Sequence, residues 1–147
     1  MAIRFAIQSV DFELPEEQKI RKWIAEVIVR RGMTVGNISY LFCDDEHELE
    51  VNRRYLDHDT YTDIITFDYV AGNLISGDIM ISVERVGENA EKLSVPFEQE
   101  LRRVIIHGVL HLLGQGDKSE GEAVEMRRQE EEALKLWDEM FRVEREA

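Results

Sequence analysis

Two histidines four residues apart, followed by a glycine and an acidic residue, form the pattern most specific for chemistry. His107 and His111 are one helical turn apart, so both imidazoles can face one ion. Gly114 suits the left-handed conformation that ends a helix, and the chain can then turn back and present Asp117. Two nitrogen ligands and one oxygen ligand leave a fourth position for water, as in catalytic zinc sites. The spacing predicts a metal centre of His107, His111 and Asp117, acting in catalysis through the metal-bound water.

Gly108 occupies the position where the metallopeptidase motif H-E-x-x-H carries its glutamate. That glutamate is the general base of peptide hydrolysis, and glycine has no side chain to replace it. The metal-ligand spacing is therefore kept without the base. This argues against an ordinary peptidase.

The same pair of histidines would also be compatible with a simple polar patch on an exposed helix. The surrounding residues are strongly apolar, which favours a buried helix whose histidines need a partner. These flanking residues are Val104, Ile105, Ile106, Val109, Leu110, Leu112 and Leu113. We therefore interpret the histidines as metal ligands.

Beyond the metal motif, three segments resemble the YbeY-type endoribonucleases, also called ribosomal RNA maturation factors. They are Asn52–Tyr55, residues 62–67 (T-D-I-I-T-F, similar to the family's T-D-V-L-S-F) and residues 77–82 (G-D-I-M-I-S, similar to G-D-I-x-I-S). The family's metal motif is usually H-G-x-L-H-L-x-G-Y-D-H, with three histidine ligands. This chain matches it through Gly114 and then has Gln115, Gly116 and Asp117. Asp is a competent zinc ligand, so the ligand set changes without being lost.

A second departure concerns the substrate. The family often has an arginine directly after the Asn-x-x-Tyr segment that helps to hold RNA, and Leu56 stands there. Arg53 and Arg54 precede it on the same expected helix and are candidates to supply that charge. The alternative interpretation is that both arginines are ordinary solvated surface residues.

The resemblance implies a zinc-dependent, single-strand-specific endoribonuclease that acts in ribosomal RNA maturation and ribosome quality control. Its implied partners are single-stranded ribosomal RNA and the small ribosomal subunit or its assembly factors. Two other functions stay open. One is a metallopeptidase or amidase with a distant carboxylate as base, and the other is a non-catalytic ribosome-assembly factor with a structural metal.

Three polar residues outside the motif are further candidates. Asp63 begins a strand after a loop, a junction that often carries active-site groups, and the resemblance suggests that its segment and that of Asp78 help to wall the cleft. Asp78 lies beside Gly77, where another part of the chain can approach closely. His58, in the preceding loop, can reach a substrate phosphate when protonated. For each, the plain alternative is a structural or solvated side chain.

The net charge of −13 opposes general binding to nucleic acid, because attraction to phosphate supplies most non-specific affinity. Many carboxylates fall in residues 120–146, which we expect to form a solvated helical face. The arginines Arg53, Arg54, Arg102 and Arg103 then remain as candidates for a local basic patch. An enzyme acting on RNA would need that charge near its site.

Composition narrows the class of protein. A length of 147 residues with 44% hydrophobic content predicts one folded domain, 1–147. No apolar run approaches the roughly 20 residues that span a bilayer, so we expect no membrane association. The single cysteine, Cys43, forms no intramolecular disulfide. Together with the lack of a secretory signal, this predicts a cytoplasmic location.

The pattern of elements predicts an α/β (α+β) fold: a single compact domain with a small mixed sheet of about four strands, packed by about five helices. Strands are expected over residues 3–7, 37–43, 64–70 and 74–83, the last two as a hairpin. Helices are expected over 15–31, from 44 to about 55, 84–93, 96–113 and 119–141. The last helix should bury Ala123, Met126, Ala133, Leu134 and Trp137. The metal site then lies at the end of a buried helix.

Overall fold

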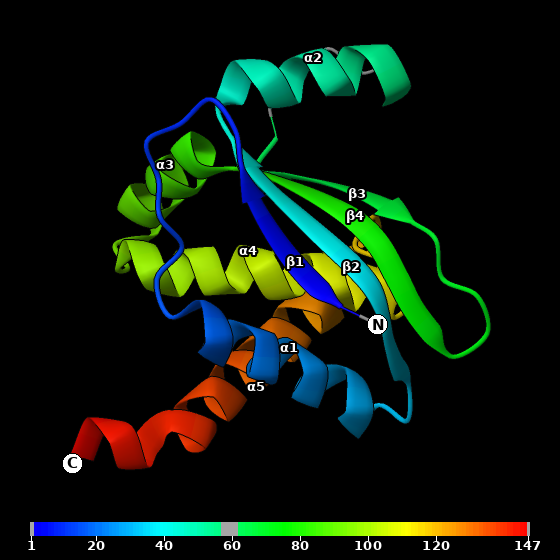
Figure 1. The fold of residues 1–147 in the computed structure, drawn as a ribbon, viewed down its shortest axis with the longest axis vertical. Coiled ribbons are helices and arrows are strands. Elements are labelled where there is room, and N and C mark those ends of the chain that lie inside the picture. The colour runs from blue at the N-terminus through cyan, green and yellow to red at the C-terminus, as the bar shows by residue number, and fades with distance from the viewer. Residues whose placement is uncertain (1, 57–61, 147) are drawn as a thin grey trace.

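Four strands form one mixed sheet in the computed structural model, which describes residues 2–56 and 62–146. β1 (Ile3–Ile7), β2 (Thr34–Cys43) and β4 (Leu74–Ser82) run parallel, and β3 (Ile64–Asp68) pairs with β4 in the antiparallel direction. The order in the sheet is β1-β2-β4-β3, so β3 is an edge strand (Figure 1). The predicted hairpin of β3 and β4 is confirmed.

Five helices accompany the sheet: α1 (Glu17–Arg30), α2 (Asp45–Leu56), α3 (Val83–Leu93), α4 (Phe97–Leu112) and α5 (Glu120–Glu146). Figure 1 shows α1, α4 and α5 together on one side of the sheet, with α2 on the other. α4 contacts β3 and β4, and α1 contacts β2 and α5. The predicted fold class, with its mixed sheet and five helices, is confirmed. None of the described helices is long and apolar enough to cross a membrane.

Alternation along the strands gives the core its position. In β2, the buried side chains of Ile38, Tyr40 and Phe42 recur at every second residue and belong to the main hydrophobic cluster. Tyr40 reaches into the helical layer, where its hydroxyl donates a hydrogen bond to the carbonyl oxygen of Ile105, at 2.9 Å. The central part of α4 is therefore fixed against the sheet.

Among the element boundaries that differ from the prediction, those at the starts of β2 and α1 have clear physical reasons. β2 begins at Thr34 rather than residue 37, because its pairing with β4 continues past an irregularity between Val35 and Ile38. Gly36 lies in that irregularity, and a Cβ there would be 2.8 Å from the carbonyl oxygen of Ile75. α1 begins at Glu17, after Glu16 in the left-handed conformation. The helix therefore starts later than Pro15 suggested.

The buried face of α5 was predicted only in part. Met126, Ala133 and Trp137 are buried, but Ala123 is exposed, so its predicted burial was wrong. The reason is position: Ala123 lies in the first turn, before α5 meets the rest of the core. Further along, the indole nitrogen of Trp23 in α1 donates to the carbonyl oxygen of Ala133, at 2.8 Å. This bond and the edge-to-face contact between Trp23 and Trp137 join α1 to α5.

Candidate metal centre

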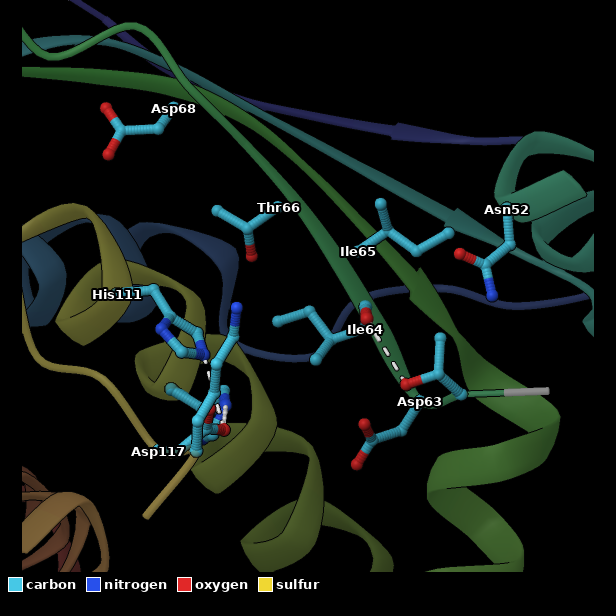
Figure 2. A pocket seen from close by; sticks show the side chains of 11 residues that line it. Asn52, Asp63, Ile64, Ile65, Thr66, Asp68, His111 and Asp117 are labelled. Carbon is cyan, nitrogen blue, oxygen red and sulfur yellow. Dashed lines mark hydrogen bonds and ion pairs between the residues drawn. The ribbon is translucent and has the colours of Figure 1, made fainter. Parts of the chain in front are cut away.

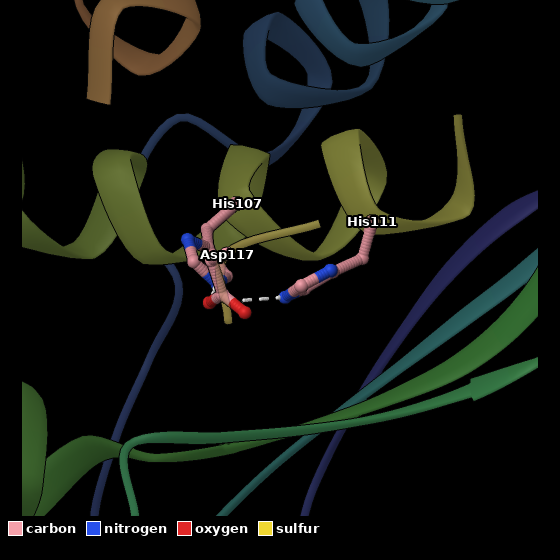
Figure 3. A group of neighbouring side chains, drawn as sticks. All are labelled: His107, His111 and Asp117. Atoms are coloured by element: carbon pink, nitrogen blue, oxygen red, sulfur yellow. Dashed lines mark ion pairs between the residues drawn. The ribbon is translucent and has the colours of Figure 1, made fainter. Parts of the chain in front are cut away.

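Three predicted ligands converge at the C-terminal end of α4. The Nε2 atoms of His107 and His111 lie 3.3 Å and 3.4 Å from the same oxygen of Asp117, Oδ2. Figure 3 shows both rings extending from α4 toward this carboxylate, which comes from the segment after the helix. The donor atoms of the three residues all lie within 4.8 Å of one another. The group fits a metal ion, and the remaining directions open to the cleft.

The spacing of these donor atoms is informative. Ligands bound tetrahedrally at about 2.0–2.2 Å from zinc are separated by roughly 3.3 Å. The separations of 3.3 Å and 3.4 Å match that value and exceed the usual length of a hydrogen bond to a carboxylate. Two nitrogen donors and one oxygen donor suit zinc and other divalent transition metals. The three side chains thus form a group whose chemistry and spacing could hold a metal ion.

Asp117 is placed by the way α4 ends. Gly114 has a φ of +98°, which confirms the left-handed turn expected at this position. The backbone nitrogen of Gln115 donates to the carbonyl oxygen of Leu110, at 3.0 Å, and so closes the last turn. The chain reverses here and brings Asp117 back beside the two histidines.

The start of α5 fixes the other end of this turn. The Ser119 hydroxyl accepts a hydrogen bond from the backbone nitrogen of Glu122, and the Glu122 carboxylate accepts one from that of Ser119. This reciprocal pair is a capping box. The side chain of Gln115 accepts a hydrogen bond from Gln129 of α5, at 2.9 Å. The segment that carries Asp117 is therefore held at both ends.

Glu130 of α5 is a member of the site that the sequence analysis missed. Its Oε2 lies 2.6 Å from Nδ1 of His107, and its side chain is only 2% exposed. Its other oxygen, Oε1, accepts a hydrogen bond from Arg103, at 3.0 Å. Burial raises the pKa of Glu130, but the hydrogen bond from His107 and the charge of Arg103 outweigh it and lower the pKa overall. The spacing of Met126, Glu130, Ala133 and Trp137 was the signal, because it places Glu130 on the buried face of α5.

A cleft of about 720 Å³ opens in front of the three ligands. One wall is the edge strand β3 with the residues before it, and Figure 2 shows Asp63, Thr66 and Asp68 on this wall, across from His111 and Asp117. Lys118 also lines the cleft and brings a positive charge that the sequence analysis did not single out. Both polar and charged groups thus surround the space in front of the donors.

Asp63 lies on the cleft wall and is not one of the proposed metal ligands. Burial raises the pKa of its carboxyl group, while the charges of His107 and Arg103 act in the opposite direction. Its Oδ2 accepts a hydrogen bond from the side chain of Asn89, at 3.1 Å. The nearby Glu48 also has a raised pKa, of about 8. Burial is the main cause, and the negative charges of Asp63 and Asp45 contribute. The cleft wall is therefore backed by a second, buried carboxyl group.

The other predicted residues lie elsewhere. Arg53 lines a separate hollow beside Asp44, and Arg54 forms an exposed ion pair with Glu50, at 3.1 Å. Asp78 lines a hollow together with Tyr55 and Met80, away from the metal ligands, so its segment does not wall the cleft through that side chain. The strand register is the reason, since Gly77 and Asp78 face opposite sides of β4. His58 lies outside the described residues.

Gly77 lies where another strand approaches closely, and Arg102 and Arg103 contact other side chains away from the cleft. A Cβ on Gly77 would lie 2.6 Å from the carbonyl oxygen of Phe67, so the close approach expected there is confirmed. Arg103 is engaged by Glu100 and Glu130, and Arg102 lies over the ring of Trp137, with 4.6 Å between the guanidinium carbon and the ring centre. Neither arginine lines the cleft.

The fold and the site define a class: an α/β protein with a mixed sheet, whose edge strand faces two histidines and an aspartate that could hold a metal ion in an open cleft. Metal-dependent hydrolases use ligands of this kind. The family model described as Endoribonuclease YbeY matches residues 4–138, and the chain belongs to this family.

Curated relatives agree with that assignment. The chain is 52% identical over 128 residues to the Endoribonuclease YbeY of Flavobacterium psychrophilum, which covers 87% of this chain and 91% of the relative. It is 50% identical over 137 residues to that of Porphyromonas gingivalis, covering 93% and 91%. Among solved structures, the solution structure of TM1509 from Thermotoga maritima matches with a TM-score of 0.65 at 22% identity, covering 97% and 93%. This last likeness concerns the fold alone.

Proposed function

We propose that this chain is a zinc-dependent, single-strand-specific endoribonuclease that acts in ribosomal RNA maturation and ribosome quality control. The observation that carries the proposal is the convergence of His107, His111 and Asp117 on one point in an open cleft. Membership of the YbeY family supplies the reaction class. The peptidase and non-catalytic alternatives are not favoured by these comparisons.

The side chains that line the cleft are proposed to have different roles: metal binding, phosphate binding and proton transfer. His107, His111 and Asp117 would hold the metal, which when bound polarises a phosphoryl oxygen and activates a water. Lys118 offers its ammonium group to a neighbouring phosphate. Asp63 lies on the opposite wall, where burial raises the pKa of its carboxyl group, the direction that suits a general acid or base.

A single strand suits this cleft better than a duplex. The flexible backbone of a single RNA strand can bend so that one phosphate reaches the proposed metal site between β3 and α4. The paired strands of a duplex keep their phosphates on a regular helix. The charge of −13 implies that binding relies on local positive charge and on the metal. The proposed partners are ribosomal RNA and the small ribosomal subunit or its assembly factors, in the cytoplasm.

Cleavage of a fluorescent single-stranded RNA tests the proposal, with the same sequence as a duplex and a peptide as parallel substrates. We expect the zinc-loaded protein to cut only the single strand and to stop after chelation. The variant His107→Ala/His111→Ala should lose both metal and activity while its circular dichroism stays that of a folded protein. Equal metal content in the variant and the parent, by elemental analysis, would overturn the proposed site.

A further inference from the structure

Glu130 contacts the ring nitrogen of His107 that points away from the ligand cluster. Nε2 of His107 faces Asp117, and Nδ1 faces the Glu130 carboxylate, at 2.6 Å. A carboxylate accepts hydrogen bonds, so this contact requires the proton on Nδ1. The lone pair of Nε2 then points toward Asp117 and the cleft. The geometry of this pair selects the imidazole tautomer that can bind a metal through Nε2.

Glu130 is itself held by a buried ion pair. Arg103 donates through Nη1 to Glu130, at 3.0 Å, and through Nε to Glu100, at 2.8 Å. The side chains of Glu100 and Glu130 are 1% and 2% exposed, so turning either carboxylate to solvent would break a buried ion pair with Arg103. The Glu130 carboxylate is therefore fixed in position before any ligand arrives.

The charges of this cluster point the same way. Among the buried side chains, the carboxylates of Glu100 and Glu130 face one guanidinium, that of Arg103, which leaves one negative charge in excess. Arg127 also lies 3.5 Å from Oε1 of Glu130, but its side chain is 56% exposed, so solvent screens its charge. The excess lies next to His107, whose far side faces the ligand cluster. A cation bound at Nε2 of His107 would offset it. The cluster thus favours a positive ion at the site without touching that ion.

We propose that Glu130 is the positioning residue of the metal centre, which holds His107 in the orientation and tautomer that binds metal. This inference rests on the proposed metal site. It also gives α5 a double role, because the turn before this helix carries Asp117 and its buried face carries Glu130. The packing of α5 against α4 therefore positions Asp117 directly and positions His107 through Glu130.

The test compares Glu130→Gln with Glu131→Gln, which removes the same charge from the next, exposed position of α5. Zinc affinity is measured by competition with a chromophoric chelator, and thermal melts report folding. We expect Glu130→Gln to weaken zinc binding by roughly 10- to 100-fold and Glu131→Gln to match the parent. Should Glu130→Gln unfold, Glu130→Asp keeps the charge next to Arg103 but withdraws the carboxylate, and it should weaken zinc binding in the same way.

A spectroscopic measurement separates positioning from simple structural support. In the zinc-loaded parent, the Nδ1 proton of His107 should give a downfield, slowly exchanging resonance, which moves upfield in Glu130→Gln. Equal zinc affinity in Glu130→Gln and Glu131→Gln, or no such resonance in the parent, would overturn the role of Glu130 alone. A parent protein that binds no zinc would instead overturn the proposed metal site, and this inference with it.

Discussion

A Cβ atom on Gly108 would lie 2.9 Å from Cδ1 of Ile79, closer than side chains pack in folded proteins. It would also lie 3.1 Å from Cδ1 of Ile64. α4 therefore rests directly on the sheet at the position that follows its first histidine. The glutamate of the metallopeptidase motif is not merely replaced here, because any side chain at this position would have to displace Ile79 and Ile64.

Gly108→Glu should consequently destabilise the protein rather than create a peptidase. We expect a loss of roughly 3 kcal/mol or more in the free energy of unfolding, as for an unpaired charge forced into a core. Chemical denaturation measures this loss. Gly121→Glu is the matched control, since a Cβ there meets nothing within 4 Å. A Gly108→Glu protein as stable as that control would contradict the packing argument.

Asp117 should set both the strength and the selectivity of metal binding. Asp117→Ala should weaken zinc binding by an order of magnitude or more, and Asp117→His should tighten it. A carboxylate is a harder ligand than imidazole, so the parent should accept manganese more readily than Asp117→His does. Isothermal titration with both metals measures these differences, with Glu120→Ala as the exposed acidic control. If Asp117→Ala keeps the parent's zinc affinity, the third ligand is another residue, and Glu122 is the next to test.

Glu48 should make the stability of the fold depend on pH. Burial raises its pKa in the folded protein to about 8, from the usual 4.5 of a glutamate, and one of its oxygens has no hydrogen-bond partner within the described residues. The folded state therefore holds a proton that the unfolded state releases between these two values. Stability should fall as pH rises from about 4.5 to about 8 and then level off.

Glu48→Gln should remove that loss and raise the free energy of unfolding above pH 8 by roughly 1–3 kcal/mol. Denaturant titrations at about pH 5, 7 and 9 measure the free energy of unfolding across the range in which Glu48 changes its protonation. Glu50→Gln, on the exposed side of the same helix, should leave the pH profile unchanged. A parent whose stability does not decrease between pH 5 and pH 9 would show that Glu48 is ionised in the fold.

Lys118 should contribute to RNA affinity through a phosphate contact, because its side chain lines the cleft. Lys118→Ala should lower the slope of log affinity against log salt by roughly 0.7 for a single strand. Arg30→Ala on α1 is the control, since Arg30 is exposed and lies outside the residues that line the cleft. Metal content should stay the same in both variants. Equal slopes for Lys118→Ala and Arg30→Ala would place the RNA elsewhere.

Arg53 and Arg54 test whether RNA extends beyond the cleft. If these residues supply the charge that the family places at Leu56, Arg53→Ala/Arg54→Ala should lower the salt slope by roughly 1.4 and weaken binding. Leu56→Arg should then strengthen binding without altering the thermal melt. An unchanged slope in the double variant, or a large fall in melting temperature for Leu56→Arg, would argue against this substitution of roles.

The convergence of the three proposed ligands was predictable because their spacing is local. One helical turn relates His107 to His111, and a glycine that ends the helix brings Asp117 back, so neither step needs knowledge of the rest of the fold. Glu130 was harder to find because it contacts His107 across 23 residues of sequence and belongs to a helix dominated by solvated carboxylates. Its burial depends on how α5 rotates against α4, which only the hydrophobic periodicity of the helix indicated.

Strand register limited the prediction of the cleft in the same way. Asp63 and Asp78 both occur next to strands, yet Asp63 lines the cleft and Asp78 lines the hollow on the other side. The face of a strand on which a side chain lies changes with each residue, and it depends on which strand pairs with which. The sequence pattern identified the strands, but the pairing of β3 with β4 decided which aspartate meets the site.

The wall opposite the proposed metal ligands is an edge strand, and this determines which groups the wall offers to a substrate. The outer edge of β3 pairs with no other strand among the described residues, so backbone N–H and C=O groups border the cleft along its length. Side-chain substitutions in Ile64–Asp68 leave these groups in place. The surface along which a substrate would lie is thus partly formed by main-chain groups, so a substitution on β3 changes the side chains of this wall but not its row of backbone donors and acceptors.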